Sequence, residues 1–218
     1  MKFLRKEVKR YINEKVKPLY KTFDKAHNLA HFKFVTSNCV EYASELIKKG
    51  YEINLEIAYL VGALHDIGIS VEREGHAKHS GEMVRLDKEL KSLFKDNEIE
   101  IIAQAVEDHS SNLGYEPRNI YGKIVSDADR NNTVYLVFSR PIKYGVEHES
   151  HLTREEQIAS VFNFVNKKFG RNGYVKYWLD IPQTKKEIQQ VWDLLDDEIR
   201  CKTYIAGILD EVTKGRLS

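Results

Sequence analysis

The chain has 218 residues, and 34 Lys and Arg nearly balance 33 Asp and Glu, which gives a formal net charge of +1. A balanced chain lacks the broad basic surface with which proteins hold nucleic acid. Hydrophobic residues make up 42% of the sequence, while Gly and Pro number only 12 and 4. We therefore expect a sizeable core, few irregular stretches and no broad nucleic-acid surface.

The two cysteines and the N-terminus bear on the compartment. Cys39 and Cys201 lie in helix-like segments and belong to no paired-spacing motif, which predicts reduced thiols. The basic N-terminal stretch lacks the apolar core of a signal peptide. No window of the sequence has the apolar length of a membrane span. We expect a cytoplasmic protein with no membrane segment.

Hydrophobic periodicity is helical along almost the whole chain, which predicts an all-α fold. The segment from about Leu55 to Asp66 is apolar on nearly every face, as in a central buried helix. Loops are expected at 110–119 and at Gly145–His151. The predicted helices run over about Phe3–Lys25, Leu29–Lys49, Leu55–Asp66, Ser80–Phe94, Asn97–His109, Ile120–Arg140, onward from the capping box of Thr153 and Glu156, and Gln183–Val212.

The expected organisation is a single domain over 1–218. Its core spans about 24–145, preceded by a helix at 1–23 and followed by a helical extension at 152–218. Aromatic residues cluster in the extension and predict core packing or an oligomer contact, as in a homodimer. They are Phe162, Phe164, Phe169, Tyr174, Tyr177 and Trp178.

Six of the eight histidines fall in the first half of the chain, and several stand where apolar residues are expected. His31 lies on the stripe of Val35, and His65 and Asp66 close the most apolar helix. His109 ends a helix whose apolar face leads to it. A lone histidine is more often an ordinary core or surface residue than a ligand. Several of them at helix ends, with acidic residues downstream, predict a bound cation.

A cation explains why these groups would be buried. Burying a carboxylate without a partner is costly, and a buried imidazole needs its ring nitrogens satisfied. A divalent metal accepts both kinds of ligand. A His and Asp set without cysteine favours Fe or Mn, with Mg, Zn, Co and Ni as further candidates.

The order of these residues resembles the HD superfamily of metal-dependent phosphohydrolases, of the HDIG type. The similar motifs are His31 with Val35, ALHDIG at Ala63–Gly68 and KIVSDADR at Lys123–Arg130. The resemblance covers about 24–140 and implies an HD-domain helical bundle with additional C-terminal helices. It implies metal ligation by His31, His65, Asp66 and one of Asp127 and Asp129. Spacing leaves the two open, and the Ala-Asp pair of the family favours Asp129.

The family has mononuclear and dinuclear branches, so one or two ions are expected. The dinuclear pattern adds two histidines, here His76 in GHAKHSG and His109 in AVEDHSS, with His79 as the alternative to His76. This order looks closest to bacterial HD hydrolases that cleave dinucleoside polyphosphates. Ile69 stands where the cyclic-dinucleotide phosphodiesterases of the superfamily have lysine, and that substrate class is not expected.

The resemblance implies a phosphohydrolase of a small phosphoester, a nucleotide or dinucleotide, with His65, Asp66 and Arg130 at its catalytic centre. The cations expected to contact phosphate are Arg130, Arg140 and Lys143, with Arg130 ranked first, and His27 is a further substrate contact. The alternative function is a metal-bearing nucleotide sensor without turnover. A purely structural helical domain is a third reading, and it predicts no bound metal.

Overall fold

The computed structural model describes residues 3–24, 27–111, 113–130 and 133–215, and every regular element within these ranges is a helix. The all-α prediction is confirmed for this part of the chain. By its internal contacts the chain divides into two compact units. The first is Met1–Arg130 with Tyr177–Leu179, and the second is Asn131–Lys176 with Asp180–Ser218. Over the same ranges no helix is both long and apolar enough to cross a bilayer.

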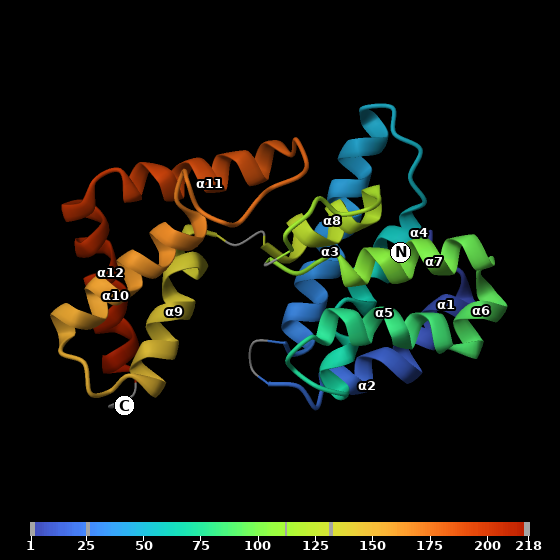
Figure 1. Cartoon of the computed structure of the whole chain (residues 1–218), viewed down its shortest axis with the longest axis horizontal. Helices are drawn as coiled ribbons and strands as arrows, with labels where there is room; N and C mark the ends of the chain where they lie inside the picture. The colour runs from blue at the N-terminus through green and yellow to red at the C-terminus, as the bar shows by residue number, and fades with distance from the viewer. Residues whose placement is uncertain (1–2, 25–26, 112, 131–132, 216–218) are drawn as a thin grey trace. The chain divides into compact units, whose positions relative to one another are not determined.

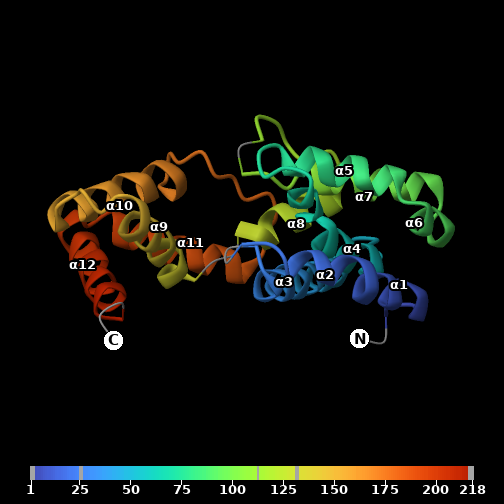
Figure 2. The ribbon, with the colours of Figure 1, turned by 90° about the horizontal axis from the view of Figure 1, so that it is seen from below.

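Helices of the first unit lie in layers. Figure 2 shows α5, α6 and α7 on one side, α1, α2 and α3 on the other, and α4 between them. The elements are α1 (Lys6–Tyr11), a π-helical segment (Ile12–Val16), α2 (Lys17–Tyr20), α3 (Leu29–Lys48), α4 (Leu55–Leu64), a 3₁₀ helix (Ile67–Ser70), α5 (His76–Leu86), α6 (Lys88–Leu93), α7 (Asp96–Glu107) and α8 (Ile120–Arg130).

Helix α4 is the centre of this unit, as its sequence predicts. All of its residues but Leu55 are buried, and it packs against α3, α7 and α8 (Figure 1). Asn54 begins it, because its side chain accepts a hydrogen bond from the Glu56 N–H. Asn28 begins α3 in the same way, through the N–H groups of Ala30 and His31. Two capped helices thus carry His31 and the His65-Asp66 doublet into one core.

The second unit is formed by four helices: α9 (Val134–His148), α10 (Arg154–Phe169), α11 (Pro182–Leu195) and α12 (Glu198–Lys214). Each of the other three contacts α12. The predicted capping box is present, since Thr153 and Glu156 bond to each other's backbone N–H groups. Within the aromatic cluster Phe169 is buried, whereas Phe164 and Tyr174 are 45% and 43% exposed.

Three expected helices are each broken in two, and one expected loop is partly helical. The segments over about 80–94, 120–140 and 183–212 each contain a polar residue that starts a new helix. Asp87, Thr133 and Asp197 accept hydrogen bonds from N–H groups three residues ahead, which begins α6, α9 and α12. The loop expected at Gly145–His151 begins later, because α9 continues to His148 with Pro141 inside it.

Candidate metal centre

The His65-Asp66 doublet lies inside the core of the first unit. His65 follows the last residue of α4, and both side chains are buried, with exposed fractions of 0% and 2% for the residues. Ser80 of α5 holds the backbone on either side: its hydroxyl donates to the His65 carbonyl at 2.7 Å and accepts from the Gly68 N–H at 2.9 Å. The apolar helix therefore delivers two polar side chains to a position shielded from water.

Three of the four histidines at this position are oriented by the same local contact. In each, Nδ1 lies beside the carbonyl oxygen of the residue three positions earlier, which can only accept, so Nδ1 carries a hydrogen. The ring then turns Nε2 away from its own helix. The pairs are His65 with Gly62 at 2.9 Å, His76 with Arg73 at 3.0 Å and His109 with Val106 at 2.6 Å.

The Nε2 atoms converge with carboxylate oxygens in two sets that share Asp66. In the His31 set (His31, His65, Asp66 and Asp129), Asp66 Oδ2 lies 3.0 Å from His65 Nε2 and 3.3 Å from His31 Nε2. Asp129 Oδ1 lies 3.3 Å from His31 Nε2.

In the His76 set (Asp66, His76 and His109), the other oxygen of Asp66, Oδ1, lies 3.3 Å from His76 Nε2 and 3.7 Å from His109 Nε2. One carboxylate thus faces two groups of imidazoles, one with each oxygen. Five of these residues form the two possible metal-holding groups in the described chain, His31 with His65 and Asp66, and Asp66 with His76 and His109.

The donors fit a cation better than they fit one another. Nε2 of His76 and Nε2 of His109 face each other at 3.2 Å, and those of His31 and His65 at 3.1 Å. Two facing imidazole nitrogens need a proton or a metal ion between them. In addition, Asp66 Oδ2 is buried and accepts no hydrogen bond of acceptable geometry despite its two close imidazoles. Imidazole nitrogens and carboxylate oxygens placed in this way could hold a divalent metal ion.

The pKa values within the cluster also favour replacing a proton with a metal ion. Burial lowers the pKa of His31, but the facing carboxylates of Asp129 and Asp66 outweigh it and raise this pKa to about 9. Burial together with the charge of His65 lowers the pKa of His109 to about 4. Metal ligation requires neutral imidazoles, so His109 is ready to bind while His31 has a proton to release.

The structure separates the two aspartates that sequence spacing leaves open. Asp129 faces His31, whereas Asp127 points to a distant segment of the chain. The Asp127 carboxylate accepts from the backbone N–H groups of Trp178, at 2.9 and 3.1 Å, and of Leu179, at 2.8 Å. Burial raises the pKa of Asp127 to about 6 in spite of these donors. Asp127 therefore does not belong to either ligand set.

Arg130, expected to contact phosphate, has its hydrogen bonds directed to the backbone. Its side chain is 5% exposed, and Nη2 donates to the carbonyls of Ser110 at 2.7 Å and His109 at 3.3 Å. The expected substrate cations Arg140 and Lys143 lie on α9 of the second unit, so the first unit does not bring them to the cluster. The helix end expected beside Pro141 is wrong, because α9 continues past it.

The two other histidines of the first half of the chain take different positions. The ring of His27 lies 5.8 Å from that of His31 and 6.5 Å from that of His76, and its Nδ1 is 2.9 Å from Asp24. It stands at the edge of the cluster, where a substrate contact was expected. His79 instead faces Glu82 at 3.3 Å and Glu72 at 3.8 Å, so His76 is the histidine of α5 that lies in the cluster.

Sequence reasoning missed several groups that support the cluster. From the sequence, Ser80 had no expected role beyond the start of a helix, although its hydroxyl fixes the backbone of the doublet. The segment Tyr177–Leu179 carries no motif, and its backbone contact with Asp127 had no signal in the sequence. Asp108 is fully buried and accepts from Arg118 and Tyr115, which ties the loop after His109 to α7. The position of Asp108 directly before His109, a candidate ligand, was the one sequence signal for this contact.

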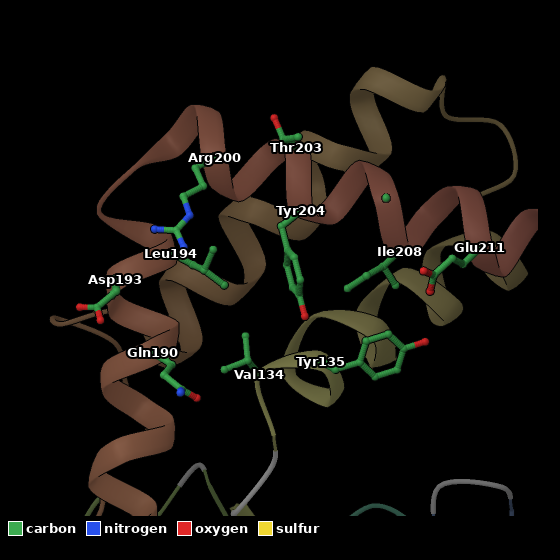
Figure 3. Close-up of a pocket in the computed structure, with 11 residues that line it drawn as sticks. Val134, Tyr135, Gln190, Asp193, Leu194, Arg200, Thr203, Tyr204, Ile208 and Glu211 are labelled. Carbon is green, nitrogen blue, oxygen red and sulfur yellow. The ribbon is translucent and has the colours of Figure 1, made fainter.

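A large cavity of the second unit contains none of the expected site residues. It has a volume of about 810 Å³ and lies among α9, α11 and α12. Figure 3 shows Tyr204 and Ile208 of α12 facing Val134 and Tyr135 of α9. The titratable cluster described above is in the other unit, so cavity size alone does not locate the chemistry of this protein.

Comparison with known proteins agrees with this location. Residues 29–132 match the family model described as the HD domain. A solved structure, described as a predicted HD superfamily hydrolase from an uncultured Thermotogales bacterium, is 20% identical, covering 86% of this chain and 88% of that one with a TM-score of 0.54. At this identity the likeness concerns the fold. No curated protein matches the chain. All six residues of the two ligand sets fall within 29–132.

Proposed function

We propose that this chain, whose residues 29–132 match the HD-domain family model, is a metal-dependent phosphohydrolase acting on a small phosphoester, a nucleotide or a dinucleotide. The observation that carries the proposal is the position of Asp66, whose two oxygens each face imidazole Nε2 atoms. A carboxylate shared in this way suits two ions held side by side. We therefore favour the dinuclear form of the site over the mononuclear one.

Each of the two sets would hold one metal ion. His31, His65, Asp66 and Asp129 would hold one ion, and Asp66, His76 and His109 the other. Fe or Mn is the proposed metal, with Mg, Zn, Co and Ni as the other candidates. When bound, such ions lower the pKa of water toward neutrality and neutralise charge on phosphate oxygens.

Protein side chains outside the ligand sets would orient the substrate. His27 is the nearest such group, since its imidazole lies beside both His31 and His76 while Asp24 fixes its Nδ1. Arg140 and Lys143 remain proposed phosphate contacts. Arg130 was expected to contact phosphate as well. Its Nη2 donates to the backbone carbonyls of Ser110 and His109, and we propose that it positions this backbone.

The remaining expectations belong to this proposal as well. Both cysteines are buried and free, which supports a reducing compartment, and we propose the cytoplasm. We also propose a single domain over 1–218, with its core at about 24–145, a helix at 1–23 and its extension at 152–218. A homodimer held by exposed aromatic residues such as Phe164 is proposed as well.

Metal content and turnover together test the function. Protein purified with Mn²⁺ should hold close to two ions per chain and hydrolyse p-nitrophenyl phosphate or its diester, and D66N should lose both properties. H76A is the informative variant, and H79A is its matched control on the same helix, one turn away and outside both sets. A nucleotide that binds the loaded protein without being hydrolysed would instead favour the sensor function. Protein without bound metal would contradict both.

A further inference from the structure

We propose that Asp127 and Arg130 are positioning residues for the His76 set, and that the segment Tyr177–Leu179 from the second half of the chain completes the metal centre. The inference rests on the proposed dinuclear function. We call the path from Trp178 and Leu179 through Asp127 and Arg130 to His109 the Asp127 relay. It links a segment without a motif to a metal ligand about 70 residues earlier.

The first step of the relay is a carboxylate that receives two successive backbone N–H groups. Trp178 N and Leu179 N donate to Asp127 at 2.9 and 2.8 Å, and the Asp127 side chain is completely buried. Consecutive N–H groups aimed at one point form a small anion-binding nest. Although the residues before and after it belong to the second unit, Tyr177–Leu179 packs as part of the first. This carboxylate therefore fixes the segment in place.

The second step joins Asp127 to Arg130, one turn later on α8. Arg130 Nη1 lies 4.0 Å from Asp127 Oδ1, and the side chains of Arg130 and Asp127 are 5% and 0% exposed. A buried guanidinium needs a carboxylate close by, because an uncompensated buried charge is strongly destabilising. The Asp127 charge thus holds the Arg130 side chain in the interior and directs its donors.

The third step reaches the metal ligand. Arg130 Nη2 donates to the carbonyls of Ser110 and His109, at 2.7 and 3.3 Å. Helix α7 ends at Glu107, so His109 stands beyond its last helical residue and depends on such contacts for its position. Moving this backbone would move the His109 ring with it, because Nδ1 is bonded within the same turn to Val106.

The His31 set should depend less on the relay. His31 and Asp129 lie within α3 and α8, and His65 directly follows α4, so regular helices or their ends hold these residues. His109 of the His76 set is the candidate ligand whose backbone carbonyl the relay binds. A break in the relay should therefore weaken the second ion more than the first, which distinguishes positioning from a general loss of stability.

Metal titration of the full-length protein with Mn²⁺ tests this. In R130M and D127N we expect the second ion to bind about 10- to 100-fold more weakly, as is typical when the support of a metal ligand is removed. The first ion should bind within about twofold of the wild type, and the EPR signal of a coupled manganese pair should be lost. R130K retains a hydrogen-bond donor, so its affinity for the second ion should lie between those of the wild type and R130M.

Two further variants address the segment and the controls. L179P removes one of the two backbone N–H groups that donate to Asp127 and should weaken the second ion. W178F keeps its backbone N–H and should bind the second ion as the wild type does. R154M is the matched control, since Arg154 of α10 pairs with Asp210 in the second unit.

The inference is overturned if folded D127N and R130M bind both ions as the wild type does, or if both ions weaken equally. A wild type that binds at most one ion would overturn the dinuclear function itself, and the inference with it.

Discussion

Adding one methyl group at Gly68 should weaken metal binding, because it displaces the start of α5, which carries both His76 and Ser80. A Cβ at this position would overlap the His76 carbonyl oxygen and would lie 2.6 Å from Ser80 N, where side-chain carbons do not approach closer than 3.0 Å. The first turn of α5 must therefore move by at least 0.4 Å, the difference between these distances. His76 is on that turn, and metal–ligand distances tolerate only about 0.2 Å.

The same overlap should also cost stability. Overpacking of this kind typically costs about 1–3 kcal/mol. For a chain of this length, each kcal/mol lowers the Tm by about 2–4 °C. Manganese titration and thermal unfolding of G68A would measure both effects.

G207A is the control, because a Cβ at Gly207 meets open space inside α12 and should raise stability by up to about 1 kcal/mol. If G68A kept two tightly bound ions and the Tm of the wild type, the close packing of Gly68 against α5 would be refuted.

Three other predictions follow from the cluster and the cysteines. H76A should retain one tightly bound ion, because the His31 set does not include His76; elemental analysis showing two ions or none would contradict this. Metal affinity should rise about tenfold per pH unit below pH 9 and level off above it, because His31, with its pKa of about 9, must lose a proton to bind the metal. Calorimetry in buffers of different ionisation enthalpy would reveal the released proton. A metal affinity that does not change with pH would contradict ligation by His31. Burial raises the pKa of Cys201 to about 11 and that of Cys39 well above its usual value, so neither thiol should react readily with DTNB at pH 8 until the protein unfolds; rapid reaction of the native protein would show that one of them is accessible.

Helix positions were largely predictable because periodicity and caps are local features. Asn28 and Asn54 begin α3 and α4 close to where the apolar pattern starts. The missed breaks at Asp87, Thr133 and Asp197 have the same local cause, but there the apolar pattern continues on both sides of the cap. Periodicity alone then joins two helices into one, and only the cap marks where the chain turns.

The sequence by itself determined the ligand candidates. His31, His65, Asp66, His76 and His109 stand at positions where burial without a cation would be costly, and burial follows from the apolar pattern around them. The structure places all five in two sets around Asp66.

Tertiary structure alone decided between Asp127 and Asp129 and gave Arg130 its contacts. Residues two apart on an α-helix point about 200° away from each other, so only one of the two aspartates can face His31. Which one does so depends on how α8 packs against α3, and on a segment about 50 residues later that offers N–H groups to the other. The local sequence pattern predicts neither the packing of α8 against α3 nor the contact of Asp127 with Leu179, because both join parts of the chain that are distant in sequence and meet only in the folded protein.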